Sequence, residues 1–282
     1  MRLNKYISHN SNYSRREADK LILEEKVKVN KKTITEGYAD VSDEDTIEIN
    51  SKPLKPTDDN FYTVIVYNKQ KGELVTKRDD RGRKTIYDTL PHKFKHFLPV
   101  GRLDFMSEGL LILSDSPKVV DALMHSDFER MYKLKIQGDI TKQMMENMED
   151  GLEIQDSLAG AHQLSKIDNM LIAPFIAYNI LKNDSKYSKL KVVISEGQNR
   201  ELRRFFGHFN KEVVDLKRIA FGSFTLDSLP SGKFRYFDKK DYKELRSYLK
   251  RVDKDDAREA EQDPTMEDEY FKTHDEDMDY DN

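Results

Sequence analysis

The sequence of 282 residues predicts an α+β protein whose main sheet is mostly antiparallel. Between residues 61 and 250, short runs rich in β-branched and aromatic residues alternate with stretches that have the apolar spacing of helices. No internal repeat occurs at the periods of solenoid proteins. We therefore expect a mixed helix and strand core in this part of the chain.

Composition divides the chain into four segments. Residues 1–50 have the pattern of a small module, and residues 51–60 contain two prolines and almost no apolar side chains, as a linker does. Residues 61–250 form the main core. Residues 251–282 are predicted to be a disordered acidic tail, in which residues 252–282 have fourteen Asp and Glu against three Lys and Arg.

The tail hides the charge of the rest of the chain. The net charge is −4, but the last 31 residues carry −11, so residues 1–251 carry +7, a weak sign of a polyanionic partner. There is no cysteine, which excludes disulfides, thiolate nucleophiles and cysteine-ligated zinc. No run approaches the ~18 apolar residues of a membrane span, and the N-terminus lacks a signal-peptide core, so we expect a cytoplasmic protein.

The first segment predicts two helices and two strands. Apolar residues recur at the spacing of one helix face in residues 3–7 and again in residues 15–25, with Ser14 placed as the N-cap of the second helix. Alternating strands follow at residues 26–30 and 46–49. An RNA-contacting face is as plausible here as a solvated surface, because nine basic residues are balanced by ten acidic ones. The candidate RNA contacts are Arg2, Lys5, Arg15, Arg16, Lys31 and Lys32.

Three runs of this segment resemble the alpha-L RNA-binding domain, which also occurs in a small-subunit ribosomal protein. They are Arg2-Leu-Asn-Lys-Tyr-Ile, Ser14-Arg-Arg-Glu-Ala-Asp and Val27-Lys-Val-Asn30. The resemblance implies that the paired helices present basic side chains to structured RNA.

The main core is predicted to contain interleaved strands and helices. The strands are expected at 61–67, 110–113, 131–136, 164–167, 177–181, 190–194, 213–219 and 232–237. The helices are expected at 85–90, 117–124, 141–149, 199–209 and 240–251. The methionines of the helix at 141–149 are interpreted as core filling.

Asp104 is the first candidate functional residue. It lies in a short polar run, with Arg102, Ser107 and Glu108, just before the apolar strand 110–113. A carboxylate fixed beside core segments is costly to desolvate unless a cation compensates it, and such groups cluster at functional sites. From spacing alone, a simple turn cap is about as good an interpretation.

A basic run at residues 199–206 supplies candidate cations. If a helix begins near Asn199, then Arg200, Arg203 and Arg204 lie within about one turn of each other. One of them could pair with Asp104 and the others could hold phosphate. The alternative is an exposed basic face with the apolar side chains turned toward the core.

Other chemistries have little support. His92 and His96 have the spacing of a helical metal pair, but no third ligand is near and no H-E-x-x-H motif occurs. Asp104 and Glu108 would come together only in a helix, which Gly109 disfavours. No glycine-rich phosphate loop and no G-x-S-x-G elbow is present.

Three further motifs resemble the RsuA/RluB group of pseudouridine synthases. They are Gly101-Arg-Leu-Asp-Phe-Met-Ser-Glu-Gly-Leu-Leu111, Glu129-Arg-Met-Tyr132 and Glu196-Gly-Gln-Asn-Arg-Glu-Leu-Arg-Arg204. With the alpha-L module, the resemblance spans about residues 1–250. It departs from the group's pattern at Gln70, where proline is usual, and after Ser114, where a glycine is missing.

The resemblance implies a role for individual residues. Asp104 matches the catalytic aspartate, Tyr132 the tyrosine that packs on the target base and serves proton transfer, and Arg203 the basic partner of the aspartate. Arg102 matches the residue that fills the place of the flipped uridine. Less directly, Ile194 or Leu202 lines the base pocket, and Arg200 and Arg204 remain candidate phosphate contacts.

The expected reaction is isomerisation of a uridine in ribosomal RNA. It consumes nothing, so neither a cofactor nor a metal is implied. Phe105 and the basic helix favour the RluB-like branch and hence 23S rRNA, with 16S rRNA as the alternative. We expect a monomer without membrane contact. The rival interpretations are a non-catalytic, ribosome-associated RNA-binding protein and a metal-dependent nuclease using Asp104 and Glu108.

Overall fold

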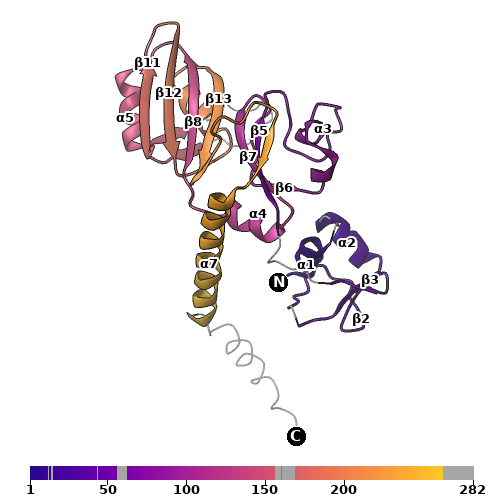
Figure 1. Ribbon diagram of the computed structural model, residues 1–282. Helices are drawn as coiled ribbons and strands as arrows, with labels where there is room; N and C mark the ends of the chain where they lie inside the picture. The colour runs from indigo at the N-terminus through magenta and orange to yellow at the C-terminus, as the bar shows by residue number, and fades with distance from the viewer. Residues whose placement is uncertain are drawn as a thin grey trace. The chain divides into compact units, whose positions relative to one another are not determined.

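The computed structural model describes residues 1–11, 13, 15–42, 44–55, 62–155, 160 and 169–262 (Figure 1). The predicted cap at Ser14 and the predicted strand 164–167 lie outside these residues. The chain forms two compact units, Met1–Tyr236 and the part from Phe237 onward. Among the described residues, no helix is long and apolar enough to cross a membrane. The predicted boundaries at residues 50, 60 and 250 remain predictions.

The N-terminal module packs two helices on a small sheet. Helix α1 (Leu3–Asn10) and helix α2 (Arg15–Leu23) are followed by β1 (Val27–Val29), β2 (Lys32–Thr33), β3 (Ile47–Ile49) and β4 (Lys52–Pro53), in the sheet order β2-β1-β3-β4. The predicted helix face is confirmed, because Leu3, Tyr6 and Ile7 are buried in one cluster with Ala18 and Ile22. This burial, and not helix propensity, stabilises helices of eight and nine residues.

The main core is a nine-stranded sheet in the order β11-β12-β8-β13-β7-β5-β15, with β14 on β13 and β6 on β7. Its strands are β5 (Val64–Lys69), β6 (Leu98–Pro99), β7 (Glu108–Ser114), β8 (Arg130–Gln137), β11 (Ala177–Lys182), β12 (Tyr187–Ile194), β13 (Val213–Phe221), β14 (Phe224–Thr225) and β15 (Phe234–Tyr236). All pairings are antiparallel except β13 with β7. The predicted α+β class with a mostly antiparallel sheet is confirmed.

Gly109 makes the one parallel pairing possible. Its φ is +106°, and a Cβ at this position would lie 2.1 Å from the carbonyl oxygen of Arg218. Because only glycine tolerates both the backbone conformation and the close approach, the glycine lets β7 lie against β13.

The sheet has two chemically different sides. Along β8, Tyr132, Leu134 and Ile136 belong to the large apolar core, and we call the side to which they point the inner face. Successive strand residues point to opposite sides, so Lys133 and Lys135 point to the outer face. The helices of this core are α3 (Ile86–Thr89), α4 (Pro117–Met124), α5 (Lys142–Asp150), α6 (Glu201–His208) and a 3₁₀ helix at His92–Phe94.

Helices α4 and α5 follow their sequence signals closely. Ser116 caps α4 ahead of its first-position proline, and Thr141 caps α5. Met144 and Met148 are fully buried in the core, which confirms their interpretation as core filling. Several elements were not predicted. Among them, β9 (Leu152–Gln155) and β10 (Asn169–Ile172) form a separate two-stranded sheet, and the others, β2, β4, β6, β14 and the 3₁₀ helix, are two or three residues long.

The C-terminal helix extends further than predicted. Helix α7 runs from Lys239 to Gln262, past the expected end at Arg251 and into the segment predicted to be disordered. The last six residues of the helix, 257–262, are Ala-Arg-Glu-Ala-Glu-Gln, all of which favour helix in spite of their charge. The first part of the predicted tail, up to Gln262, is therefore helical.

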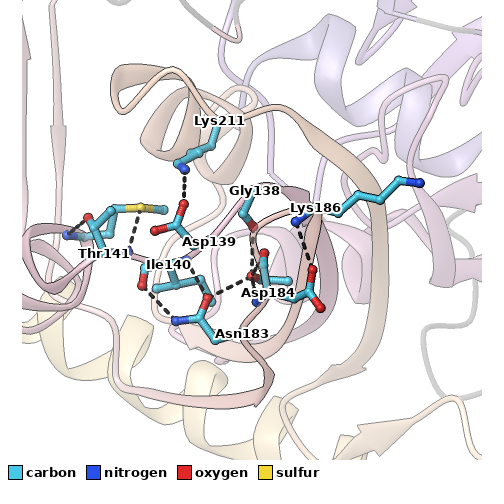
Figure 2. A network of polar contacts seen from close by, with 10 residues as sticks. Gly138, Asp139, Ile140, Thr141, Asn183, Asp184, Lys186 and Lys211 are labelled. Carbon is cyan, nitrogen blue, oxygen red and sulfur yellow. Dashed lines mark hydrogen bonds and ion pairs between the residues drawn. The ribbon is translucent and has the colours of Figure 1, made fainter.

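A polar network fixes one end of the sheet (Figure 2). The side-chain amide of Asn183 donates to the carbonyl oxygen of Ile140 over 2.9 Å, and its oxygen accepts from the backbone N–H of Ile140 over 2.8 Å. The ammonium of Lys211 lies 2.8 Å from the Asp139 carboxylate. Ser188 on β12 donates to the carbonyl oxygen of Gly138. These bonds join the end of β8 to the β11–β12 turn and so fix these strands relative to one another.

Candidate active site

One pocket collects the residues of all three motifs. It has a volume of about 230 Å³ and lies between the loop before β7, the strands β8, β12 and β13, and the beginning of α6. Its lining residues are Arg102, Leu103, Asp104, Ser107, Tyr132, Ile194, Gly197, Gln198, Asn199, Arg200, Glu201, Leu202 and Leu216. Segments almost 100 residues apart in the sequence thus meet at Asp104.

A buried lysine holds the loop that carries Asp104. Lys69 ends β5 with no exposed surface, and its ammonium donates to the carbonyl oxygens of Gln70, Asp104 and Ser107 over 2.8–3.0 Å. Burial lowers the pKa of Lys69 to about 8, so at neutral pH it is still mostly charged. Two of these charge-assisted bonds fix the backbone of the loop at Asp104 and at Ser107, and the third goes to Gln70 beside Lys69.

Two arginines face the Asp104 carboxylate. Its Oδ2 lies 3.6 Å from Arg200 Nη1 and 3.7 Å from Arg203 Nε. Arg203 is anchored by donating to the carbonyl oxygens of Val213 (2.8 Å) and Met106 (3.3 Å), while its Nε, turned toward Asp104, is buried without a hydrogen bond. Burial, and then the neighbouring cation of Arg200, lowers the pKa of Arg203 from its usual value.

The first turn of α6 supplies both arginines and a buried acid. Arg200 caps the helix in the left-handed conformation, with φ at +56°, and its Nε donates to the carbonyl oxygen of Gly160 over 2.7 Å. Glu201 is 4% exposed and accepts from the N–H of Gln198 over 2.8 Å. Burial raises the pKa of Glu201 to about 7. Glu201 is therefore a second carboxyl group in the pocket, and burial raises its pKa toward neutrality.

Tyr132 rests against a buried arginine that the sequence did not reveal. Arg218 is the register partner of Tyr132 across β8 and β13, is 5% exposed, and donates from Nε to the carbonyl oxygen of Leu110 over 2.8 Å. Burial lowers the pKa of Arg218, and its hydrogen bond to the Tyr132 hydroxyl opposes that shift. Its guanidinium also lies 5.6 Å from the ring centre of Phe221. The sequence gives little indication that Arg218 is buried, because it follows Lys217 in a strand whose pattern predicts half-exposed positions.

The remaining predicted residues fall into three groups. Arg102 is exposed and lines the pocket. The buried apolar side chains of Ile194 and Leu202 also line it. Arg204 does not fit its predicted phosphate contact, because its side chain is fully buried and donates to the carbonyl oxygen of Asn199. In the N-terminal module, Lys5 is half-buried and the exposed candidates are Arg2, Arg15, Arg16, Lys31 and Lys32.

No metal cluster is found among the described residues, since no three of their His, Cys, Asp or Glu side chains come together as ligands. His92 opens a 3₁₀ helix, whereas His96 lies beyond it and packs on Phe97. Asp104 and Glu108 are separated by a turn, closed by a bond from the Ser107 N–H to the Asp104 carbonyl oxygen, and are not on one helix.

Comparison with known proteins gives consistent results for both parts of the chain. Residues 1–47 match the S4 domain, and residues 63–208 match the RNA pseudouridylate synthase family. A pseudouridine synthase of Helicobacter pylori is 47% identical over 88% of this chain and 95% of its own length. The ribosomal large subunit pseudouridine synthase B of Bacillus subtilis is 30% identical over 87% of this chain and 96% of its own.

A solved pseudouridylate synthase has the same fold. The two structures superpose with a TM-score of 0.59 at 23% identity, over 87% of this chain and 99% of the other. The resemblance inferred from the sequence motifs is therefore confirmed for both the N-terminal module and the main core.

Proposed function

The chain belongs to the RNA pseudouridylate synthase family, and from this premise we propose that it isomerises one uridine of 23S ribosomal RNA, with Asp104 as the catalytic residue. The observation that carries the proposal is the Asp104 carboxylate, held in the pocket between Arg200 and Arg203. Membership in a family of enzymes also disfavours the rival interpretation as a non-catalytic RNA-binding protein.

Asp104 would act at the ribose of the target uridine. The C1′–N1 bond must break, the base must turn, and C5 must bond to C1′ in place of N1. A carboxylate beside C1′ can attack that carbon directly or remove a ribose proton, and both routes regenerate the carboxylate. Arg200 and Arg203, whose guanidinium nitrogens lie 3.6 and 3.7 Å from the carboxylate, orient the side chain in either case.

Tyr132 and Arg102 would handle the base. Tyr132 lines the pocket beside Asp104, where its ring can pack on a flipped uracil and its hydroxyl can serve removal of the C5 proton. The negative charge that loss of the C5 proton leaves on the base would lie near the guanidinium of Arg218, the register partner of Tyr132. Arg102 is exposed at the rim, where it can occupy the space that the uridine leaves in the RNA stack.

Two observations support ribosomal RNA, and the large subunit in particular, as the substrate. The chain begins with an S4 domain, and several relatives, from Bacillus subtilis and Vibrio cholerae among others, are named ribosomal large subunit pseudouridine synthase B. The alternative is 16S rRNA. A cytoplasmic, monomeric enzyme without cofactor is part of the same proposal.

Mapping of pseudouridine in cellular rRNA tests the substrate. Cells that lack the protein are complemented with the wild type or with Asp104→Asn, and 16S and 23S rRNA are mapped by adduct formation and primer extension. We expect one 23S uridine to lose its modification in the deletion and to regain it only with the wild type. Restoration in 16S rRNA instead would establish the alternative substrate, and restoration by Asp104→Asn would refute the site.

A further inference from the structure

The outer face of the sheet carries a cluster of lysines that the reaction does not use. Figure 1 shows β11, β12, β8 and β13 side by side. Three of these strands contribute side chains on the side away from Tyr132, which lines the pocket. We call this set the lysine face, and its members are Lys133 and Lys135 on β8, Lys189 and Lys191 on β12, and Lys217 on β13.

The register places these lysines directly opposite each other. Lys133 on β8 has Lys191 on one side and Lys217 on the other, and Lys135 pairs with Lys189. Like charges directly opposite in a sheet are destabilising. These five lysines therefore make three unfavourable cross-strand pairs within one small area, although Lys135 also has Asp215 and Lys217 also has Glu108 as a register partner.

Carboxylates do not neutralise the cluster. Among the described residues, none of the five lysines forms an ion pair with an acidic side chain. Asp215, the register partner of Lys135 on β13, is instead paired with Lys71, and Glu108, the register partner of Lys217 on β7, forms no ion pair with it. Lys135 instead lies 4.3 Å from the ring centre of Tyr187. Lys133 and Lys189 are exposed and the other three are half-buried, so water reaches all five.

We propose that the lysine face binds the phosphate backbone of a second segment of the RNA substrate, distinct from the segment that enters the pocket. The charge complementarity of five unpaired lysines with an RNA backbone is the argument for this partner. Alternate residues on a strand lie about 6.7 Å apart and neighbouring strands about 4.8 Å apart, so the ammonium groups form a dense grid. Long, flexible lysine arms suit contacts that track phosphates without reading bases.

The position of the face explains why one RNA strand cannot make all the contacts. Tyr132 and Lys133 are neighbours in β8 and point to opposite sides of the sheet, so the pocket and the lysine face are separated by the sheet itself. A large folded RNA can reach both sides at once, whereas a short stem-loop that fills the pocket cannot. The face would thus favour extended rRNA over small fragments.

The test is the salt dependence of RNA binding by the full-length protein. We compare the wild type with the triple variant Lys133→Gln, Lys191→Gln, Lys217→Gln on 23S and 16S rRNA transcripts, from about 50 to 300 mM salt. If three phosphate contacts are lost, the slope of log Kd against log salt falls by about 2 to 3, and Kd rises about 10-fold or more near 0.1 M salt. The rate of pseudouridine formation at saturating RNA should not change.

A matched control removes the same charge elsewhere in the core. Lys95, Lys142 and Lys233 are exposed and lie off the lysine face, so Lys95→Gln, Lys142→Gln, Lys233→Gln should leave the slope within about one unit of the wild type. If the two triple variants behave alike, the proposal is wrong, and an acidic protein becomes the better partner. The single variant Lys133→Gln, with an expected slope change of about 1, replaces the triple if that variant does not fold. The binding slope does not depend on which rRNA is modified, so this result stands apart from the 23S assignment.

Discussion

The two faces of one strand treat the same charge in opposite ways. Lys217 and Arg218 are consecutive residues of β13, and the side chain of Lys217 points outward without an ion pair while that of Arg218 is buried on the inner face. Arg218 has a carbonyl acceptor in Leu110 and a hydrogen bond to Tyr132, whereas Lys217 lies between Lys133 and Glu108 in the sheet and forms an ion pair with no described acidic side chain. A buried cation requires hydrogen-bonding or charged partners, whereas an exposed cation is solvated by water and does not.

This contrast separates the two uses of cations in the enzyme. On the inner face, Arg218 is buried and hydrogen-bonded, so its removal should disturb the geometry of the active site. On the outer face, each lysine is held loosely and repelled by its neighbours, so its removal should weaken RNA binding while the fold gains stability.

Asp104→Asn should reduce the rate of pseudouridine formation by about 10⁴-fold or more. The amide keeps the size of the side chain but can neither attack C1′ nor accept a ribose proton. Binding to the RNA should change less than about 3-fold, because backbone contacts dominate affinity. Single-turnover kinetics together with filter binding measure both, and a comparable loss of affinity would point to a binding role.

Arg218→Met should slow catalysis by about 10- to 100-fold, since Tyr132 loses the group that positions its hydroxyl. Methionine has a similar length and packs well in apolar surroundings, so the core should remain intact. The neighbouring Lys217→Met is the matched control on the same strand. It should leave the single-turnover rate unchanged and raise Kd, and equal rates for the two variants would contradict the division between the faces.

Glu201→Gln should remove the part of the pH dependence of the free energy of unfolding that comes from Glu201. Because burial raises the folded-state pKa of Glu201 from 4.5 to about 7, the folded protein holds this proton more tightly than the unfolded chain. Its contribution to the free energy of unfolding is therefore full below about pH 4.5 and falls as the pH rises toward 7. The glutamine keeps the acceptor for Gln198.

Urea denaturation at pH 5 and pH 8 checks this sign. Relative to the wild type, Glu201→Gln should be more stable at pH 8 than at pH 5, by at most about 3 kcal/mol. A difference that is the same at both pH values would show that the Glu201 carboxyl is not perturbed by burial.

Lys133→Gln should stabilise the fold slightly while it weakens RNA binding. The change relieves the repulsion from Lys191 and Lys217, with an expected gain of about 0.5 kcal/mol in the free energy of unfolding at low salt. The gain should shrink at 1 M salt, where the charges are screened. Thermal or urea denaturation at the two salt concentrations measures it, and a loss of stability would mean that Lys133 serves the fold.

Local sequence signals predicted much of the fold. The capped helices α4 and α5 and the apolar strand β7 lie where their patterns placed them, because each has both a clear period and a clear start. The hairpin of β9 and β10 was missed, since strands of four residues give too short a pattern. The end of α7 was misjudged because its charge was given more weight than its helix propensity.

The site was predicted only where a motif marked it. Asp104, Tyr132 and Arg203 come together in the pocket, or directly beside it, as their motifs suggested. Lys69 and Arg218 could not be found this way, because their partners lie 35 to 108 residues away and their burial depends on the assembled sheet. Arg204 shows the converse error, since a basic residue in a basic run was assumed to be exposed.

Tritium release from RNA labelled at C5 of uridine directly tests whether Asp104 catalyses the isomerisation, because every conversion to pseudouridine frees the C5 hydrogen to water. Purified wild type and Asp104→Asn are incubated with labelled 23S and 16S transcripts. The account predicts release equivalent to one uridine per 23S molecule with the wild type, and none with Asp104→Asn at equal RNA occupancy. Release by the Asp104→Asn variant at the wild-type rate would contradict it.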